Sequence, residues 1–205
     1  MEFEKICNLD NIDLHVHTRY SADSFMSPEK IVRFAEKYKK IIAITDHNEI
    51  AGALEAKKCD RENRIIIGEE ILALDIGAEI LAYDIRKKIE AGKAAEIIKE
   101  IHDQGGMAVL AHPFRSGYLW RKKIPAYPDD IIQAIDGVEV WNTRNSRKEN
   151  AKALLFAENY KKIKARGSDA HMMWELYFGN YNCILLNLLK NFLTVLIKQI
   201  KKIRF

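Results

Sequence analysis

Five of the six histidines in this sequence lie at or just after short apolar segments that are predicted to be β-strands. Along the chain these residues are His15, His17, His47, His112 and His171. If the strands surround a β/α barrel, their carboxyl ends share one rim, and active sites are built on that rim. The sixth histidine, His102, lies within a predicted helix and is expected to be a solvated surface residue.

Carboxylates accompany these histidines. Asp46 precedes His47, Glu69 and Glu70 close the third predicted strand, and Asp169 lies two residues before His171. Imidazole and carboxylate together form an environment that suits divalent metal ions. Burying so many ionisable groups without a metal would be costly.

The spacing of the first two histidines is informative by itself. Side chains at alternate positions of a strand point to the same face, so His15 and His17 can both reach one site. The histidine pair alone is a modest signal, but its repetition at several strand ends makes a metal site the favoured interpretation.

Short apolar runs alternate with longer periodic segments, which is typical of βα units around a parallel sheet. The predicted strands are Ile12 to His17, Ile41 to Thr45, Arg64 to Glu70, Ile80 to Tyr83, Met107 to Ala111, Val138 to Trp141 and Ile163 to Arg166. Ser27 is predicted to cap a helix that begins at Pro28. Further helices are predicted at Ala51 to Cys59, Lys93 to Asp103, Pro128 to Ala134 and Arg147 to Tyr160.

Seven strands in a chain of 205 residues favour a closed or nearly closed β/α barrel, with an open doubly wound sheet as the alternative. Residues 1–205 are expected to form a single domain, because no linker or repeat divides them. From Leu185, apolar residues recur every three or four positions, which predicts a C-terminal amphipathic helix. That helix is expected to pack on the barrel, with a dimer face or a membrane-surface contact as alternatives.

Composition excludes several classes of protein. With 48% hydrophobic and 30% charged residues the chain can form a core, and a net charge of +4 gives no argument for binding duplex DNA. The three cysteines, Cys7, Cys59 and Cys183, form neither a disulfide framework nor a zinc-finger spacing, so a reducing cytoplasm is expected. Neither a signal peptide nor a membrane-spanning segment is predicted.

The motifs around these residues resemble those of the PHP (polymerase and histidinol-phosphatase) superfamily. They are Asp13-Leu14-His15-Val16-His17-Thr18 with Ser21-Ala22-Asp23, Thr45-Asp46-His47, Gly68-Glu69-Glu70-Ile71, Ala111-His112-Pro113 and Gly167-Ser168-Asp169-Ala170-His171. The resemblance spans residues 13 to 171. It implies an α/β fold, a distorted seven-stranded (β/α)7 TIM-like barrel, holding two to three divalent ions that hydrolyse phosphoesters.

The resemblance also implies a set of ligands. A first metal would be held by His15, His17, Glu70 and Asp169. Glu70 would bridge to a second metal that also binds His112, and a third would be held by Asp23, His47 and His171. At the second metal the family usually supplies a further histidine, where this chain has Glu79, with Asp84 as a fallback candidate.

Clustered divalent ions lower the pKa of a bound water, and the hydroxide formed is the expected nucleophile. The mixed donor set suits Zn, Mn or Fe. Glu70, Asp169 and His47 are predicted as catalytic residues. Phosphate charge is expected to be met by Arg19, Arg115 and Arg144, because arginine suits bidentate phosphate contact.

The predicted function is therefore hydrolysis of a small phosphomonoester, a nucleotide or a short oligonucleotide. Tyr118 and Trp120 could stack on a base or pack on the barrel. One alternative is a non-catalytic nucleic-acid-binding barrel. The other is a C–N or ester metallohydrolase, since amidohydrolase barrels also begin with His-x-His. Those barrels typically carry a metal-bridging lysine after strand four, where this chain has Tyr83 and Asp84. The oligomeric state is left open.

Overall fold

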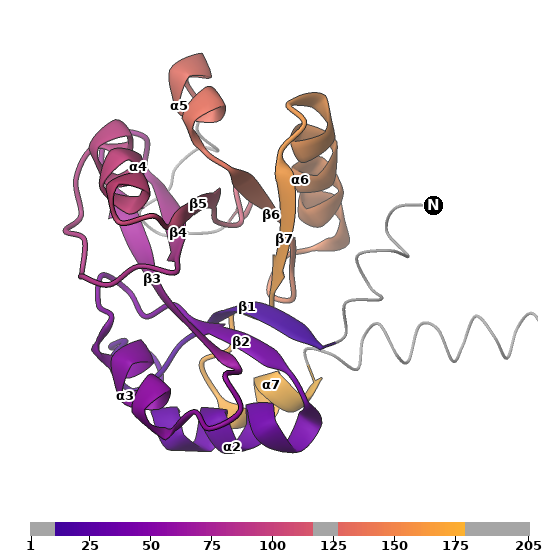
Figure 1. The fold of residues 1–205 in the computed structure, drawn as a ribbon. Coiled ribbons are helices and arrows are strands. Elements are labelled where there is room, and N and C mark those ends of the chain that lie inside the picture. The colour runs from indigo at the N-terminus through magenta and orange to yellow at the C-terminus, as the bar shows by residue number, and fades with distance from the viewer. Residues whose placement is uncertain (1–10, 117–126, 179–205) are drawn as a thin grey trace, which may run out of the picture.

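The structure is a computed structural model that describes residues 11–116 and 127–178. Its strands form one seven-stranded sheet in sequence order (Figure 1). The strands are β1 (Ile12–Val16), β2 (Ile41–Ile44), β3 (Ile65–Ala73), β4 (Ala78–Tyr83), β5 (Met107–Leu110), β6 (Gly137–Asn142) and β7 (Ile163–Gly167). Every predicted strand is present, with bounds displaced by a few residues.

The sheet curls until its first and last strands meet. The backbone N–H of His17 donates to the carbonyl of Ala170 at 2.9 Å, and that of Asp169 donates to the carbonyl of His15 at 2.7 Å. These bonds join β1 to the segment that leaves β7. The fold is therefore a nearly closed seven-stranded barrel, as predicted.

One strand runs against the others. β3 does not end at Glu70 as predicted but continues to Ala73, and β4 returns beside it as an antiparallel hairpin that pairs Ala73 with Ala78. Gly77, at φ 57°, takes a left-handed conformation in the turn. A parallel crossover needs a dozen or more residues, which the short segment between the two strands cannot supply. This reversal is the distortion of the barrel, and β4 pairs antiparallel with β5 as well.

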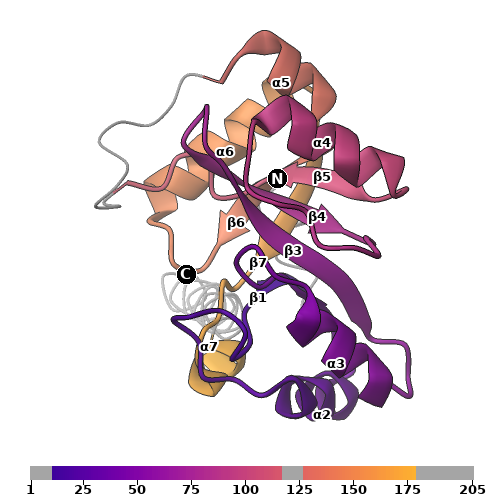
Figure 2. The same ribbon diagram turned by 90° about the vertical axis from the view of Figure 1, so that its left-hand side faces the viewer.

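Helices cover the outside of the barrel (Figure 1 and Figure 2). They are α2 (Pro28–Tyr38), α3 (Ala51–Cys59), α4 (Ala94–Asp103), α5 (Asp129–Ala134), α6 (Arg147–Asn159) and α7 (Met173–Phe178). The first five of these confirm predicted helices, and Ser27 caps α2 by accepting a hydrogen bond from the N–H of Lys30. α7 was not predicted. The predicted C-terminal helix from Leu185 lies outside the described residues, as do Tyr118 and Trp120.

The barrel interior is filled by apolar side chains below the histidine rim. Small residues such as Ala43, Ala111 and Ala165 pack with Leu81 and Tyr83 in one buried cluster. Two larger clusters lie outside the strands, beneath the helices. Among the described residues, no helix is long and apolar enough to cross a membrane.

Candidate metal centre

Four predicted ligands converge at the carboxyl end of the barrel. His15 Nε2 lies 3.2 Å from Glu70 Oε2 and 3.8 Å from Asp169 Oδ1, while His17 Nε2 lies 3.4 Å from each of these oxygens. A tetrahedral metal with ligand distances of about 2.0–2.2 Å separates its ligands by about 3.3–3.6 Å. The four measured distances, 3.2–3.8 Å, bracket the separation that such an ion sets between its ligands.

Hydrogen bonding supports the same conclusion. His15 Nε2, His17 Nε2 and Glu70 Oε2 are buried atoms that form no hydrogen bond of acceptable geometry in the described part of the chain, although the two nitrogens lie 3.2 and 3.4 Å from that oxygen. Leaving such groups unsatisfied is costly, and metal ligation would satisfy all three. The residues present therefore fit a divalent ion at this point.

The other nitrogen of each imidazole is held by a neighbouring group. His15 Nδ1 lies 3.0 Å from Oε1 of the buried Glu139. His17 Nδ1 lies 3.0 Å from Ser21 Oγ, which donates to Asp46 Oδ1 at 2.8 Å. A ring that donates from Nδ1 presents the lone pair of Nε2 to a metal. Both rings thus direct Nε2 toward the carboxylates of the cluster, the orientation that metal ligation would need.

Glu70 connects this group to a second one. Its Oε1 lies 2.9 Å from His112 Nε2, and its Oε2 lies 3.0 Å from His47 Nδ1. Glu79 completes the second group: its Oε2 lies 3.7 Å from His112 Nε2, and it clusters with His47 and Glu70. The reversal of β4 explains this placement, because the start of an antiparallel strand lies at the carboxyl end of its neighbours. The side chain of Glu79 is only 12% exposed.

A third group lies at the outer edge of the cluster. His171 Nε2 is 3.1 Å and His47 Nε2 is 3.7 Å from Asp23 Oδ2. His171 Nδ1 donates to the carbonyl oxygen of Asp169 at 2.9 Å, since a carbonyl can only accept, so Nε2 is free to act as a ligand. The ring of His47 thus lies between Glu70 and Asp23 and adjoins both groups.

The carboxylates and histidines alter each other's protonation. Burial opposes ionisation of Glu70 and Asp169, but the nearby histidines, above all His15, hold the pKa of both carboxyls well below its usual range. Burial also opposes charge on His47, yet Glu70 raises its pKa to about 11. In the metal-free cluster, protons are therefore bound to imidazole rather than to these carboxylates.

Two further groups are perturbed chiefly by burial. Burial lowers the pKa of His17 to about 4, so this ring is neutral and ready to coordinate at neutral pH. Burial and the charge of Glu70 raise the pKa of Glu79 to about 7. A cation beside Glu79 would favour its ionised form.

The three predicted phosphate-binding arginines have different surroundings. Arg115 Nη2 lies 2.6 Å from Asp169 Oδ2, and its side chain is 12% exposed, so it reaches the cluster. Arg19 instead pairs with Glu55 at 2.5 Å, and Arg144 pairs with Glu175 at 2.8 Å. The structure thus brings Arg115 to the centre and pairs the other two with the partly buried carboxylates of Glu55 and Glu175.

Several residues that hold the site were not singled out from the sequence. Glu139, in the middle of β6, accepts the backbone N–H of His112 at 2.8 Å as well as contacting His15. Asn142 Nδ2 donates to both oxygens of Glu139 at 3.1 Å and to Asp169 Oδ2 at 3.3 Å. A polar residue inside the apolar run of β6 was the only available sequence signal for Glu139.

Backbone conformation also contributes. His112 at φ 22° and Asp169 at φ 57° both depart from the backbone angles that L-residues prefer. Strain of this kind concentrates at functional sites. Gly167 is required by close approach, because a Cβ at this position would overlap the Cβ of His15.

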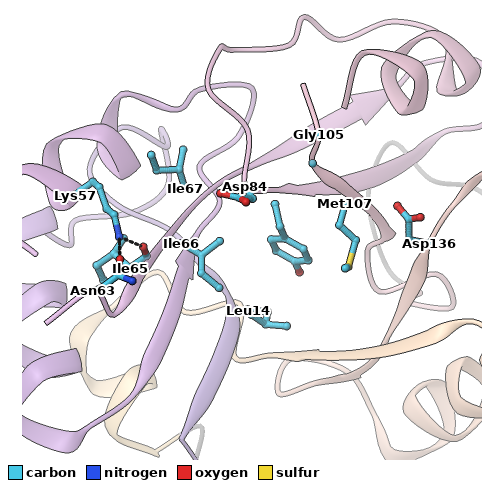
Figure 3. A pocket seen from close by; sticks show the side chains of 12 residues that line it. Leu14, Lys57, Asn63, Ile65, Ile66, Ile67, Asp84, Gly105, Met107 and Asp136 are labelled. Carbon is cyan, nitrogen blue, oxygen red and sulfur yellow. Dashed lines mark hydrogen bonds between the residues drawn. The ribbon is translucent and has the colours of Figure 1, made fainter. Parts of the chain in front are cut away.

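A hollow of about 620 Å³ is lined by none of the proposed metal ligands (Figure 3). It lies where β3 and β5 begin and β4 ends, between Leu14, Ile66 and Met107. Asp84 lines it, so the expectation that Asp84 could replace the missing histidine ligand is wrong. Because β4 is reversed, its carboxyl end points away from the metal cluster. For the same reason, Tyr83 and Asp84 do not occupy the place of a bridging lysine.

A nearly closed barrel with clustered imidazoles and carboxylates at one end is typical of metal-binding barrels. A model of the PHP domain matches residues 13–189. The chain therefore belongs to the PHP domain family. Its sequence is 35% identical over 145 residues to the uncharacterized protein MJ1587 of Methanocaldococcus jannaschii, covering 63% of this chain and 80% of that protein. It is 32% identical over 171 residues to the uncharacterized protein MJ0417 of the same organism, covering 80% and 67% respectively.

Solved structures share the fold. A Bifidobacterium adolescentis protein, described provisionally as a metal-dependent phosphoesterase, matches 78% of this chain and 87% of its own, with a TM-score of 0.66 and 19% identity. An amidohydrolase from Chromobacterium violaceum, solved with sulfate and no metal, matches 80% and 88%, with a TM-score of 0.65 and 19% identity. A two-domain Bacteroides vulgatus protein with a predicted PHP-like phosphoesterase matches 78% and 52%, with a TM-score of 0.60 and 19% identity.

Proposed function

We propose that this protein is a metal-dependent phosphoesterase that hydrolyses a small phosphomonoester, a nucleotide or a short oligonucleotide. The observation that carries the proposal is the position of Glu70. One of its oxygens faces His15, His17 and His47, and the other faces His112. A carboxylate so placed can join two adjacent metal ions, the arrangement that phosphatases and nucleases use.

Two or three divalent ions, Zn, Mn or Fe, would be held by the three groups of ligands. The first group is His15, His17, Glu70 and Asp169; the second adds His112 and Glu79 to Glu70; the third is Asp23, His47 and His171. When bound, such ions supply Lewis acidity, which activates water and neutralises phosphate charge. Glu70, Asp169 and His47 are the proposed catalytic residues among these ligands.

Exposure indicates the direction from which a substrate approaches. Of the nine proposed ligands, only Asp23 and His47 have side chains at least a third exposed, at 58% and 34%. The remaining ligands are buried or nearly so, which excludes bulk water from the deeper part of the cluster. A phosphate therefore enters on the side of Asp23 and His47.

Arg115 is proposed to bind the phosphate. Its Nε donates to Asn145 Oδ1 at 2.8 Å and its Nη2 contacts Asp169, so the guanidinium is held at the edge of the cluster. A planar guanidinium suits bidentate contact with phosphate oxygens. Arg19 and Arg144 could contribute to phosphate binding after exchanging their carboxylate partners.

Cys59 is an exposed free thiol, which is consistent with the proposed cytoplasmic location.

Hydrolysis of a C–N bond is a second candidate, because a structure of similar fold is described as an amidohydrolase. The two activities differ in the charge that the site must stabilise. A phosphoester brings its own negative charge to Arg115, whereas an amide develops charge only during reaction. Substrate profiling separates them.

The test is hydrolysis of an aryl phosphate, a panel of nucleotides, short oligonucleotides and amide substrates by metal-free protein and by protein reconstituted with Mn or Zn. We expect phosphoester turnover that requires metal and is lost in the variant His15→Ala/His17→Ala. Turnover of amides alone would favour the second candidate. A protein that binds no metal and yet retains nucleic acid would instead be a non-catalytic binding barrel.

A further inference from the structure

A basic hollow lies between α2 and α7, on the outside of the barrel. The two helices lie together in both views (Figure 1 and Figure 2), and Phe34 and Tyr177 meet edge to face with ring centroids 5.0 Å apart. The hollow has a volume of about 220 Å³. It is lined by Lys30, Arg33, Phe34, Lys37, Met173 and Tyr177, and we call it the α2–α7 groove.

The three cations of the groove lie on one face of α2. Lys30, Arg33 and Lys37 are spaced three and four residues apart, which places them in a row on a helix. All three are exposed, and within the described part of the chain none forms a salt bridge. Salt bridges to carboxylates are formed by many other exposed cations, among them Arg19, Lys39, Lys88, Lys93 and Lys99. The groove therefore concentrates positive charge that no carboxylate of the described residues neutralises through a salt bridge.

Aromatic rings lie beside these cations. Tyr177 is 39% and Tyr38 is 43% exposed, and their rings pack edge to face at 5.8 Å. Trp174, one turn before Tyr177 on α7, is 60% exposed but does not line the hollow. A row of cations beside an exposed ring suits single-stranded nucleic acid, because phosphates pair with the cations and bases stack on the ring.

The groove adjoins two loops that carry proposed metal ligands. α2 and α7 follow directly from the two loops that carry Asp23 and His171. These loops are bonded to each other, since Phe25 N and Ser24 Oγ both donate to the carbonyl of His171, at 3.3 and 3.0 Å. Met173, two residues beyond His171, already lines the groove. A chain with one end at Asp23 and His171 can therefore continue along α2.

We propose that the α2–α7 groove binds the backbone of a single-stranded oligonucleotide whose terminal phosphate lies at the metal cluster. The placement of that phosphate rests on the proposed phosphoesterase function; binding in the groove does not. A concave surface suits a chain better than a flat lipid bilayer. Exposed tyrosine and tryptophan rings give bases a stacking surface that an acidic peptide would not use.

The test is fluorescence anisotropy of a fluorescein-labelled single-stranded hexanucleotide with the full-length protein. The variant Lys30→Ala/Arg33→Ala/Lys37→Ala is expected to weaken binding about tenfold or more and to reduce the slope of log K against log salt by about 2. Tyr177→Ala is expected to weaken binding by about tenfold without changing that slope. A matched control, Lys58→Ala/Arg61→Ala/Lys87→Ala, removes the same charge elsewhere and is expected to bind like the wild type.

Equal binding by the wild type and the groove variant would overturn the proposal. The proposal would also be overturned if polyglutamate or phosphatidylserine vesicles competed more tightly than unlabelled oligonucleotide. These two probes represent an acidic peptide and a membrane. Aryl phosphate turnover by the wild type is measured separately. Groove-dependent binding without any turnover would reject the phosphoesterase function and retain the groove as a binding site. Turnover without groove-dependent binding would retain the phosphoesterase function and reject the groove.

Discussion

His15 Nδ1 lies 3.0 Å from Oε1 of Glu139, a residue 124 positions away in the sequence and fully buried. The other oxygen of Glu139 accepts the backbone N–H of His112 at 2.8 Å. One carboxylate thus positions proposed ligands from two metal groups. Glu139 does not itself face a metal group, so its effect on the centre is exerted through these two histidines.

Replacing Glu139 by alanine is expected to weaken metal binding by roughly 10- to 100-fold, because His15 loses the acceptor that fixes its tautomer. Glu139→Gln is expected to cost less, since its amide oxygen can still accept from Nδ1. Dissociation constants from chelator competition measure both effects. Glu100→Ala, an exposed change on α4, is the control, and wild-type metal affinity in Glu139→Ala would contradict the positioning role.

Gly167→Ala is expected to displace His15 from the cluster, because the new methyl group overlaps the His15 Cβ. Overpacking of this kind costs about 1–3 kcal/mol of stability. Urea unfolding of the metal-free protein measures the loss, and metal content measures the displacement. At Gly92 an added Cβ would lie 3.9 Å from the carbonyl oxygen of Glu90, an ordinary contact, so Gly92→Ala should change neither quantity.

The stability of the metal-free protein is expected to depend on Glu69. This side chain is buried, its Oε2 accepts the N–H of Ile89 at 2.9 Å, and burial raises its pKa to about 8. A carboxyl with a raised folded-state pKa contributes stability that is present below about pH 4.5 and is lost as the pH rises through 8. Glu69→Gln keeps a hydrogen-bond acceptor without the charge.

As the pH increases from 4.5 to 9, the free energy of unfolding of Glu69→Gln should therefore rise by about 2–4 kcal/mol relative to that of the wild type. Chemical unfolding at a series of pH values gives this difference. The exposed change Glu100→Gln should follow the wild-type curve. A constant difference between Glu69→Gln and the wild type across this range would show that Glu69 does not titrate in the folded protein.

Arg115→Ala is expected to lower kcat/KM for an aryl phosphate by roughly 10- to 100-fold while metal content stays within about twofold. Arg115→Lys should recover only part of this loss, because an ammonium cannot make bidentate contact. Arg19→Ala and Arg144→Ala should have smaller effects, since both guanidinium groups already pair with carboxylates outside the metal cluster. An equal loss in all three variants would mean that phosphate binding is shared around the rim.

Local sequence rules predicted the parts of the site that depend on one strand or one strand end. The alternation of His15 and His17 placed both rings on one face, and both now lie near Glu70 Oε2. The helix that begins at Pro28 followed from its cap residue. These features depend on a few neighbouring residues, so they can be read from a short window.

Features that depend on distant pairing were harder to predict. The antiparallel course of β4 could have been deduced from the short segment after Glu70, which leaves no room for a crossover helix. Treating β4 as parallel led to the wrong interpretation of Asp84. Glu139 could not be assigned a role from its own strand, because its partners His15 and His112 lie on other strands.

The metal content of the reconstituted protein tests the central claim most directly. Mass spectrometry of the dialysed Mn- or Zn-loaded wild type should give two to three ions per chain. Glu70→Gln should bind at least one ion fewer, because this carboxylate faces ligands of more than one group. Equal metal content in Glu70→Gln and the wild type, or no metal in either, would contradict the assignment of Glu70 as the residue that joins the metal sites.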